Sequence, residues 1–110
     1  MIHHLLETEP DLAGSRGYRP ASLMREGFIH CSETPAQALA VAARWFAGAT
    51  RLIVWTIDEA LVDAPIVREA GRDRPHERFP HIYGPLALEA VVARQVMVRA
   101  STDDAWVWPR

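Results

Sequence analysis

Polar residues interrupt an otherwise apolar stretch early in the chain. Gly27 to Ser32 reads Gly-Phe-Ile-His-Cys-Ser, a β-prone run that begins at a glycine and ends just before a helix start. Side chains on a strand point alternately to its two faces, so Phe28, His30 and Ser32 share one face. In a plain core strand that face would be apolar. The histidine and the hydroxyl on this face therefore need an explanation.

A second stretch repeats this pattern. Phe79 to Leu86 reads Phe-Pro-His-Ile-Tyr-Gly-Pro-Leu, and in an extended conformation Phe79, His81 and Tyr83 share a face. A third histidine, His4, lies in the apolar run from Ile2 to Leu6, which predicts a first strand. Three histidines on separate predicted strands could line one cleft.

The remaining pattern predicts strands and helices that do not alternate regularly. Arg51 to Ile57 is apolar on both faces and rich in β-branched residues, which predicts a central, doubly covered strand. Thr34-Pro35-Ala36-Gln37 has the order of a helix start and predicts a helix from Ala36 to Ala47, ended by Gly48. These elements favour an α+β fold in a single domain that covers residues 1–110.

Shorter elements complete the prediction. One or two helical turns are expected from Ala21 to Glu26, with Gly27 as their end. A short strand is expected from Pro65 to Glu69. Leu88 to Val98 favours a strand with a bulge near Arg94-Gln95, since its valines are typical of strands. Trp106 and Trp108 indicate a last edge segment that docks aromatic side chains.

Composition narrows the classes of function. The formal charge is −2 and the isoelectric point about 6.2, so no overall basic field attracts nucleic acid. The single cysteine excludes an intrachain disulfide and suits a reducing compartment. The N-terminus lacks the pattern of a signal peptide, and no apolar run approaches the roughly 20 residues that span a bilayer. We expect a soluble, cytoplasmic protein without a membrane partner.

Two catalytic hypotheses find little support in the spacing of the residues. Three histidines can hold a catalytic zinc ion, but His30 and His81 belong to no His-x-His or His-x-x-x-His pair. A nucleophilic Cys31 would need a base beside it, but the side chains next to it on the strand point to the opposite face. We therefore predict no metal site, and Cys31 is read as a small buried residue.

A pocket for an anionic small molecule fits the residue types better. Histidines and hydroxyls would hold ribose or phosphate oxygens while Phe28, Phe79 or Tyr83 stacks a ring. The chain has no lysine and no glycine-rich phosphate loop. Phosphate contacts would then fall to the helix start at Thr34 or to arginines, namely Arg16, Arg19, Arg68, Arg72, Arg74 and Arg78. Taken singly, each histidine could instead be a hydrogen-bonded core residue, and Glu69 a surface carboxylate.

The two histidine stretches resemble a small bacterial and plant family known as domain of unknown function 952. Further matches are Ile2-His3-His4, Tyr18-x-Pro20-x-Ser22-Leu23 and Val67-x-Glu69, so that the resemblance covers nearly the whole chain. The family is grouped with ADP-ribosyltransferase-like folds. That resemblance implies a split mixed or antiparallel sheet with a few flanking helices, whose cleft holds NAD or a related nucleotide in active members.

The resemblance also implies roles for single residues. His4 resembles the first-strand histidine that contacts the nicotinamide ribose, and Glu69 is a candidate carboxylate for catalysis. We expect catalytic residues at His30, His81 and Glu69, and ligand-binding residues at His4, Tyr18, Phe28, Ser32 and Tyr83. The His-Tyr-Glu or Arg-Ser-Glu set of the active groups does not stand here in clear order.

The hypothesis is therefore a histidine-lined cleft that binds or processes NAD, ADP-ribose or another phosphorylated, nucleotide-like ligand. An enzyme of this kind would be an ADP-ribosyltransferase-like or phosphotransferase-like transferase. The alternative is a non-catalytic ligand-binding or interaction domain that retains the fold, because a fold does not by itself confer an activity. A zinc-dependent enzyme is a third alternative, and the sequence leaves the oligomeric state open.

Overall fold

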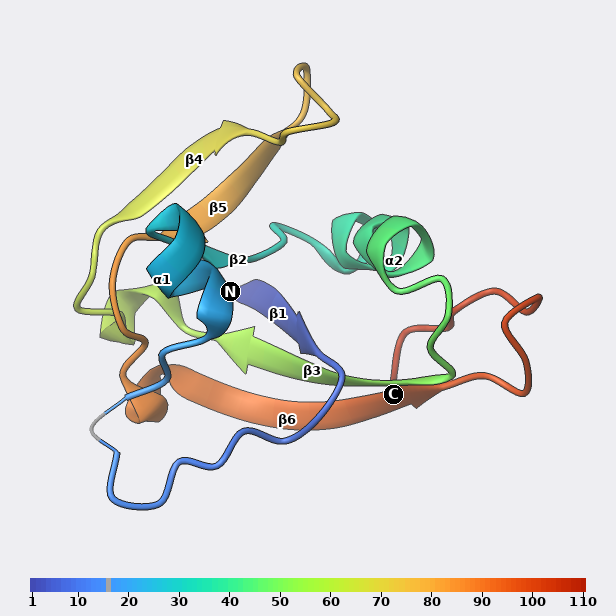
Figure 1. Cartoon of the computed structure of the whole chain (residues 1–110), viewed down its shortest axis with the longest axis horizontal. Coiled ribbons are helices and arrows are strands. Elements are labelled where there is room, and N and C mark those ends of the chain that lie inside the picture. Colours follow the sequence, from blue (N-terminus) through green and yellow to red (C-terminus); the bar gives the residue numbers. More distant parts are fainter. Residues whose placement is uncertain (16) are drawn as a thin grey trace.

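The computed structural model describes residues 1–15 and 17–110, and over these residues it is an α+β structure (Figure 1). The α+β prediction is thereby confirmed. Over the described residues two three-stranded antiparallel sheets are accompanied by two α-helices and two short 3-10 helices. In chain order the elements are β1 (Ile2–Leu6), α1 (Ala21–Glu26), β2 (Ile29–His30), α2 (Pro35–Trp45), β3 (Arg51–Ile57), η1 (Glu59–Leu61), β4 (Ile66–Ala70), β5 (Arg78–Ile82), η2 (Leu88–Ala90) and β6 (Val91–Val98).

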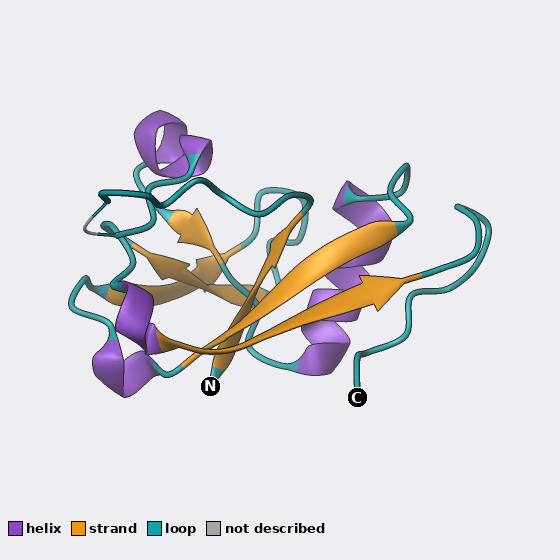
Figure 2. Ribbon diagram, turned by 90° about the horizontal axis from the view of Figure 1, so that it is seen from below, coloured by secondary structure: helices purple, strands orange, loops and turns teal. Residues whose placement is uncertain are grey.

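The first sheet has the order β1-β3-β6, with β3 in its centre. The bounds of β3 are those that the sequence predicts, and the strand is buried on both faces. Leu52 and Val54 pack with Met97 and Trp106 on the side of α2. The opposite face of β3, which carries Trp55, packs into the larger core. In both views the loop after β6 lies on the same side of the molecule as α2 (Figure 2).

The second sheet has the order β2-β5-β4. Ile29 pairs with Ile82, and His30 pairs with His81 in the next position. Ile29 and Ile82 are fully buried in the larger core. Because side chains alternate along a strand, His30 and His81 point away from that core, to the opposite face of the sheet. The sheet therefore carries a polar face that the core does not occupy.

The two sheets meet at one backbone contact between β1 and the residues after β2. The amide of His3 donates to the carbonyl of Ser32 at 2.9 Å, and the amide of Ser32 donates back at 2.7 Å. This pair brings the start of the chain against the end of the Gly27–Ser32 stretch. The arrangement positions His4 directly behind β2.

Local residue chemistry sets the start of α2 and the end of α1. The hydroxyl of Thr34 accepts a hydrogen bond from the amide of Gln37 at 3.1 Å, and α2 starts at Pro35, one residue before the predicted start. The helix ends at Trp45, two residues before the predicted end. Helix α1 ends at Gly27, whose φ of 86° lies in the left-handed region that glycine adopts without strain. Both helix predictions are confirmed to within two residues.

Two details of the prediction are wrong. The register of β3 and β6 shifts between Thr56 and Ile57, so the extra residue of the bulge is Val92 and not Arg94 or Gln95. The C-terminal segment docks its tryptophans but forms no strand: Trp106 is buried, and Trp108 meets the ring of His3 edge-on at 5.0 Å. Over residues 1–15 and 17–110, no helix has the length and hydropathy that crossing a membrane would require.

Candidate functional site

A group of aromatic and polar side chains lies on the outward face of the second sheet. We call it the His30–His81 cluster and define it as Phe28, His30, Glu69, His81 and Tyr83. The rings of His30 and His81 meet edge-on with centroids 5.4 Å apart, and Phe28 stacks on His81 at 4.0 Å with an interplanar angle of 19°. Tyr83 lies 5.3 Å from Phe28. The structure thus brings together five of the eight site residues that the sequence predicts.

Glu69 orients His81 within this cluster. The Nδ1 of His81 lies 2.7 Å from a carboxylate oxygen of Glu69, and the hydroxyl of Tyr83 donates to the same oxygen. Because a carboxylate only accepts, Nδ1 of His81 donates in this hydrogen bond, and in the neutral ring the lone pair is on Nε2. The hydrogen bond from Tyr83, and then that from His81, holds the pKa of Glu69 below its usual value. Such a pair can present an imidazole as a proton acceptor.

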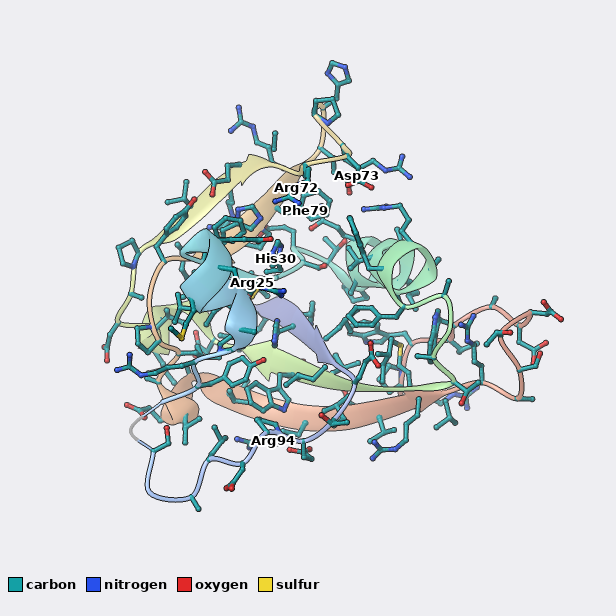
Figure 3. The ribbon with its side chains drawn as sticks, viewed as in Figure 1. Arg25, His30, Arg72, Asp73, Phe79 and Arg94 are labelled. Carbon is teal, nitrogen blue, oxygen red and sulfur yellow. The ribbon has the colours of Figure 1, made fainter. Side chains whose placement is uncertain are left out.

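His30 has a different carboxylate partner, which the sequence analysis missed. Its Nε2 lies 2.5 Å from Oε2 of Glu26, the last residue of α1. The other oxygen of Glu26 lies 3.6 Å from the guanidinium of Arg72. The only signal in the sequence was the four-residue spacing from Glu26 to His30, across a glycine that ends the helix. In Figure 3 Arg25, His30, Phe79 and Arg72 follow one another from the end of α1 to the turn after β4.

His4 lies behind this cluster, in the core. Its Nδ1 donates to the backbone carbonyl of His30 at 2.6 Å, and its Nε2 accepts from the hydroxyl of Tyr18 at 2.9 Å. Burial lowers the pKa of His4 to about 4, so the ring is neutral at physiological pH. Burial also raises the pKa of Tyr18 to about 12. Both nitrogens of His4 are therefore engaged within the protein, and the cluster contains two of the three predicted histidines.

Ser32 and Cys31 also lie apart from the cluster. Ser32 is buried at the junction of the two sheets, where its backbone pairs with His3. Cys31 is buried, and burial raises the pKa of its thiol far above the ordinary value. A thiol in that state is a poor nucleophile, in keeping with the reading of Cys31 as a small buried residue.

Of the arginines predicted to contact phosphate, Arg72 lies next to the cluster, where it contacts the carboxylate of Glu26. Arg68 is instead held by two carboxylates, Glu33 at 2.8 Å and Glu59 at 2.5 Å, and its pKa is raised by these hydrogen bonds. Arg16 lies outside the described residues. Among the described residues no three histidine, cysteine, aspartate or glutamate side chains gather in a way that could hold a metal ion.

Two surface grooves lie elsewhere on the molecule. One, of about 420 Å³, is lined by residues between Leu6 and Ala21 and includes Tyr18. The other, of about 500 Å³, lies between α2 and the segment from Arg99 to Trp106. Neither is lined by a residue of the His30–His81 cluster. Of the predicted ligand-binding residues, Tyr18 thus borders a groove that is separate from the cluster.

Comparison with known proteins identifies relatives without an assigned activity. The crystal structure of protein CC0527 from Caulobacter crescentus is 32% identical, with a TM-score of 0.71 over 92% of this chain and 90% of that chain. A double mutant of the same protein gives 30% identity and a TM-score of 0.72 over the same shares. No curated protein matches the sequence. The profile of the family described as "Protein of unknown function (DUF952)" matches residues 6–94, and the chain therefore belongs to the DUF952 family, as its two histidine stretches indicated.

Proposed function

We propose that the His30–His81 cluster binds a phosphorylated, nucleotide-like ligand such as ADP-ribose or NAD. The observation that carries this proposal is the stacked pair of Phe28 and His81, with the ring of His30 edge-on to it, on the outward face of a sheet. Phe28 and His81 belong to neither apolar core, because Ile29 and Ile82 fill the larger core from the opposite face of the sheet; His81 is buried against Phe28.

The chemistry of the cluster matches the two parts of such a ligand. Phe28 and Tyr83 offer ring faces on which a base can stack, and Tyr83 is 38% exposed. His30 and Arg72 offer nitrogen donors to phosphate oxygens, with side chains 56% and 82% exposed. Arginine is well suited to phosphate because its guanidinium presents several donors in one plane.

A transferase activity would use the pair of Glu69 and His81. Glu69 fixes the ring of His81, and Nε2 of His81 would accept a proton from an attacking group. The two antiparallel sheets agree with the split sheet of ADP-ribosyltransferase-like folds. However, His4 engages both nitrogens with Tyr18 and the backbone of His30. This favours ligand binding over an ADP-ribosyl transfer in which His4 contacts the ribose.

A ligand titration tests the proposal. The protein is mixed with ADP-ribose, NAD, inorganic pyrophosphate or adenosine up to about 10 mM, and the melting temperature and amide NMR shifts are recorded. A ligand at 100 times its dissociation constant stabilises the folded state by about 2.7 kcal/mol. We expect saturable binding of ADP-ribose or NAD, with shifts that map to β2 and β5.

Matched variants locate the site. His30→Ala should weaken binding about tenfold or more, a loss of about 1.4 kcal/mol, because it removes a donor to a charged group. His76→Ala is the control, since His76 is exposed in the loop before β5. No saturable shift with any of the phosphorylated ligands, or equal binding by both variants, would contradict the proposal.

A further inference from the structure

The carboxylate of Glu26 lies between two nitrogen groups that come from separate parts of the chain. Its Oε2 lies 2.5 Å from Nε2 of His30, on β2, and its Oε1 lies 3.6 Å from Nη2 of Arg72, in the turn after β4. Glu26 is 27% exposed, whereas both of its partners are more than half exposed. Each carboxylate oxygen thus has its own partner.

Helix stability does not explain this position. Glu26 is the last residue of α1, where the negative end of the helix dipole disfavours an acidic side chain. The contacts with His30 and Arg72 span sequence separations of four and 46 residues, and they tie α1 to the edge of the second sheet. An acceptor with two oxygens held by an imidazole and a guanidinium is the arrangement in which proteins hold phosphate or carboxylate groups.

We propose that the carboxylate of Glu26 occupies the position that an oxyanion of the ligand takes, so that Glu26 holds the site closed until a ligand displaces it. This inference rests on the proposed function and adds to it an anion subsite and a means of regulation. His30 and Arg72 would donate to the phosphate of the ligand, and the side chain of Glu26 would turn out to solvent. Ligand binding therefore costs the two contacts of Glu26.

Removing the charge of Glu26 should strengthen binding of anions. In Glu26→Gln the amide keeps the shape of the side chain but has no charge, so it competes less strongly with a phosphate and does not repel it. We expect inorganic pyrophosphate and ADP-ribose to bind about tenfold more tightly to this variant than to the wild type. Uncharged adenosine should bind equally to both proteins. Titration with acetate distinguishes a carboxylate-bearing ligand from a phosphorylated one.

Two controls separate the subsite from general electrostatics. Glu89→Gln removes the same charge from η2 and should leave pyrophosphate affinity unchanged. Glu89 forms no ion pair with another residue that the structure describes. Arg72→Ala should weaken pyrophosphate binding by the Glu26→Gln protein, while Arg51→Ala, at the exposed start of β3 in the first sheet, should not. Melting curves of each variant confirm that it is folded.

The outcomes distinguish this inference from the proposed function. If the wild type binds ADP-ribose and Glu26→Gln binds it equally or more weakly, the inference is overturned and the proposed function stands. If only Glu26→Gln binds, the inference is supported, and the wild type does not bind the ligand as proposed. If neither protein binds a phosphorylated probe, both proposals fail.

Discussion

Acidification should destabilise this protein through His4. His4 is 8% exposed, and its two ring nitrogens hydrogen-bond to a tyrosine hydroxyl and a backbone carbonyl. Desolvation by burial is the largest cause that lowers the pKa of His4, from 6.5 to about 4. A protonated ring would lose the hydrogen bond from Tyr18, because Nε2 would then have no free lone pair.

The sign and size of the effect follow from proton linkage. Above about pH 6.5 His4 is neutral in both the folded and the unfolded chain, and its contribution to stability is fully present. Between about pH 6.5 and pH 4 the unfolded chain binds a proton that the folded protein refuses, so the free energy of unfolding falls by about 1.4 kcal/mol per pH unit. The whole loss is about 3 kcal/mol, and about 2 kcal/mol of it is reached at pH 5.

Urea denaturation between about pH 7.5 and pH 4.5 measures this loss. His4→Gln removes the titrating group, so the slope of the unfolding free energy against pH should fall by the equivalent of about one proton. His76→Gln, in an exposed loop, should leave this slope unchanged. NMR titration of the histidine rings in the wild type gives a second measurement that does not depend on how stable the variant is. A ring of His4 that titrates near its ordinary pKa, or equal pH profiles for wild type and His4→Gln, would refute the reasoning.

Three further predictions concern stability and reactivity. Arg99 donates to the carbonyls of Phe46, Ala47 and Ala49 after α2. Arg99→Ala should therefore lower the free energy of unfolding by about 2 kcal/mol in urea denaturation. A loss below about 0.5 kcal/mol would contradict this role of Arg99. Gly27→Ala should lower the free energy of unfolding by about 1 kcal/mol in the same assay, because φ of Gly27 is 86°. Gly48→Ala should lower it less, since φ of Gly48 is not in the left-handed region and an added Cβ meets open space. Equal losses for the two variants would argue against backbone strain at Gly27. Cys31 should react with a thiol reagent only after denaturation, since burial raises the pKa of its thiol, and rapid labelling of the native protein would show that the site opens.

The local elements of this fold were readable from the sequence because each has a local physical cause. Arg51 to Ile57 is apolar on both faces, and only a central strand buries both faces. Thr34, Pro35 and Gln37 fix the start of α2 through contacts within one helical turn. The sequence predicts the bulge two residues too late, near Arg94 instead of at Val92. The position of the bulge depends on the register between β3 and β6 and not on the residues of β6 alone.

The candidate site was predictable only in part. Alternation along a strand places His30 on one face with Phe28, and His81 on one face with Tyr83, from the order of the residues alone. The sequence could not establish which strands are neighbours, and pairing of β2 with β5 decides that the two histidines meet.

Only the tertiary structure decided the partners of the histidines. It placed His4 behind β2, against the carbonyl of His30, and it brought Glu69 to His81 across two strands. It also placed Glu26 between His30, which lies beyond the glycine that ends α1, and Arg72, which is 46 residues away along the chain. Chemical roles depend on which groups share a hydrogen bond, and such pairs form between residues that are distant along the chain. The sequence therefore determined the elements and the residue types of the cluster, while the packing of the two sheets decided which of these residues act together.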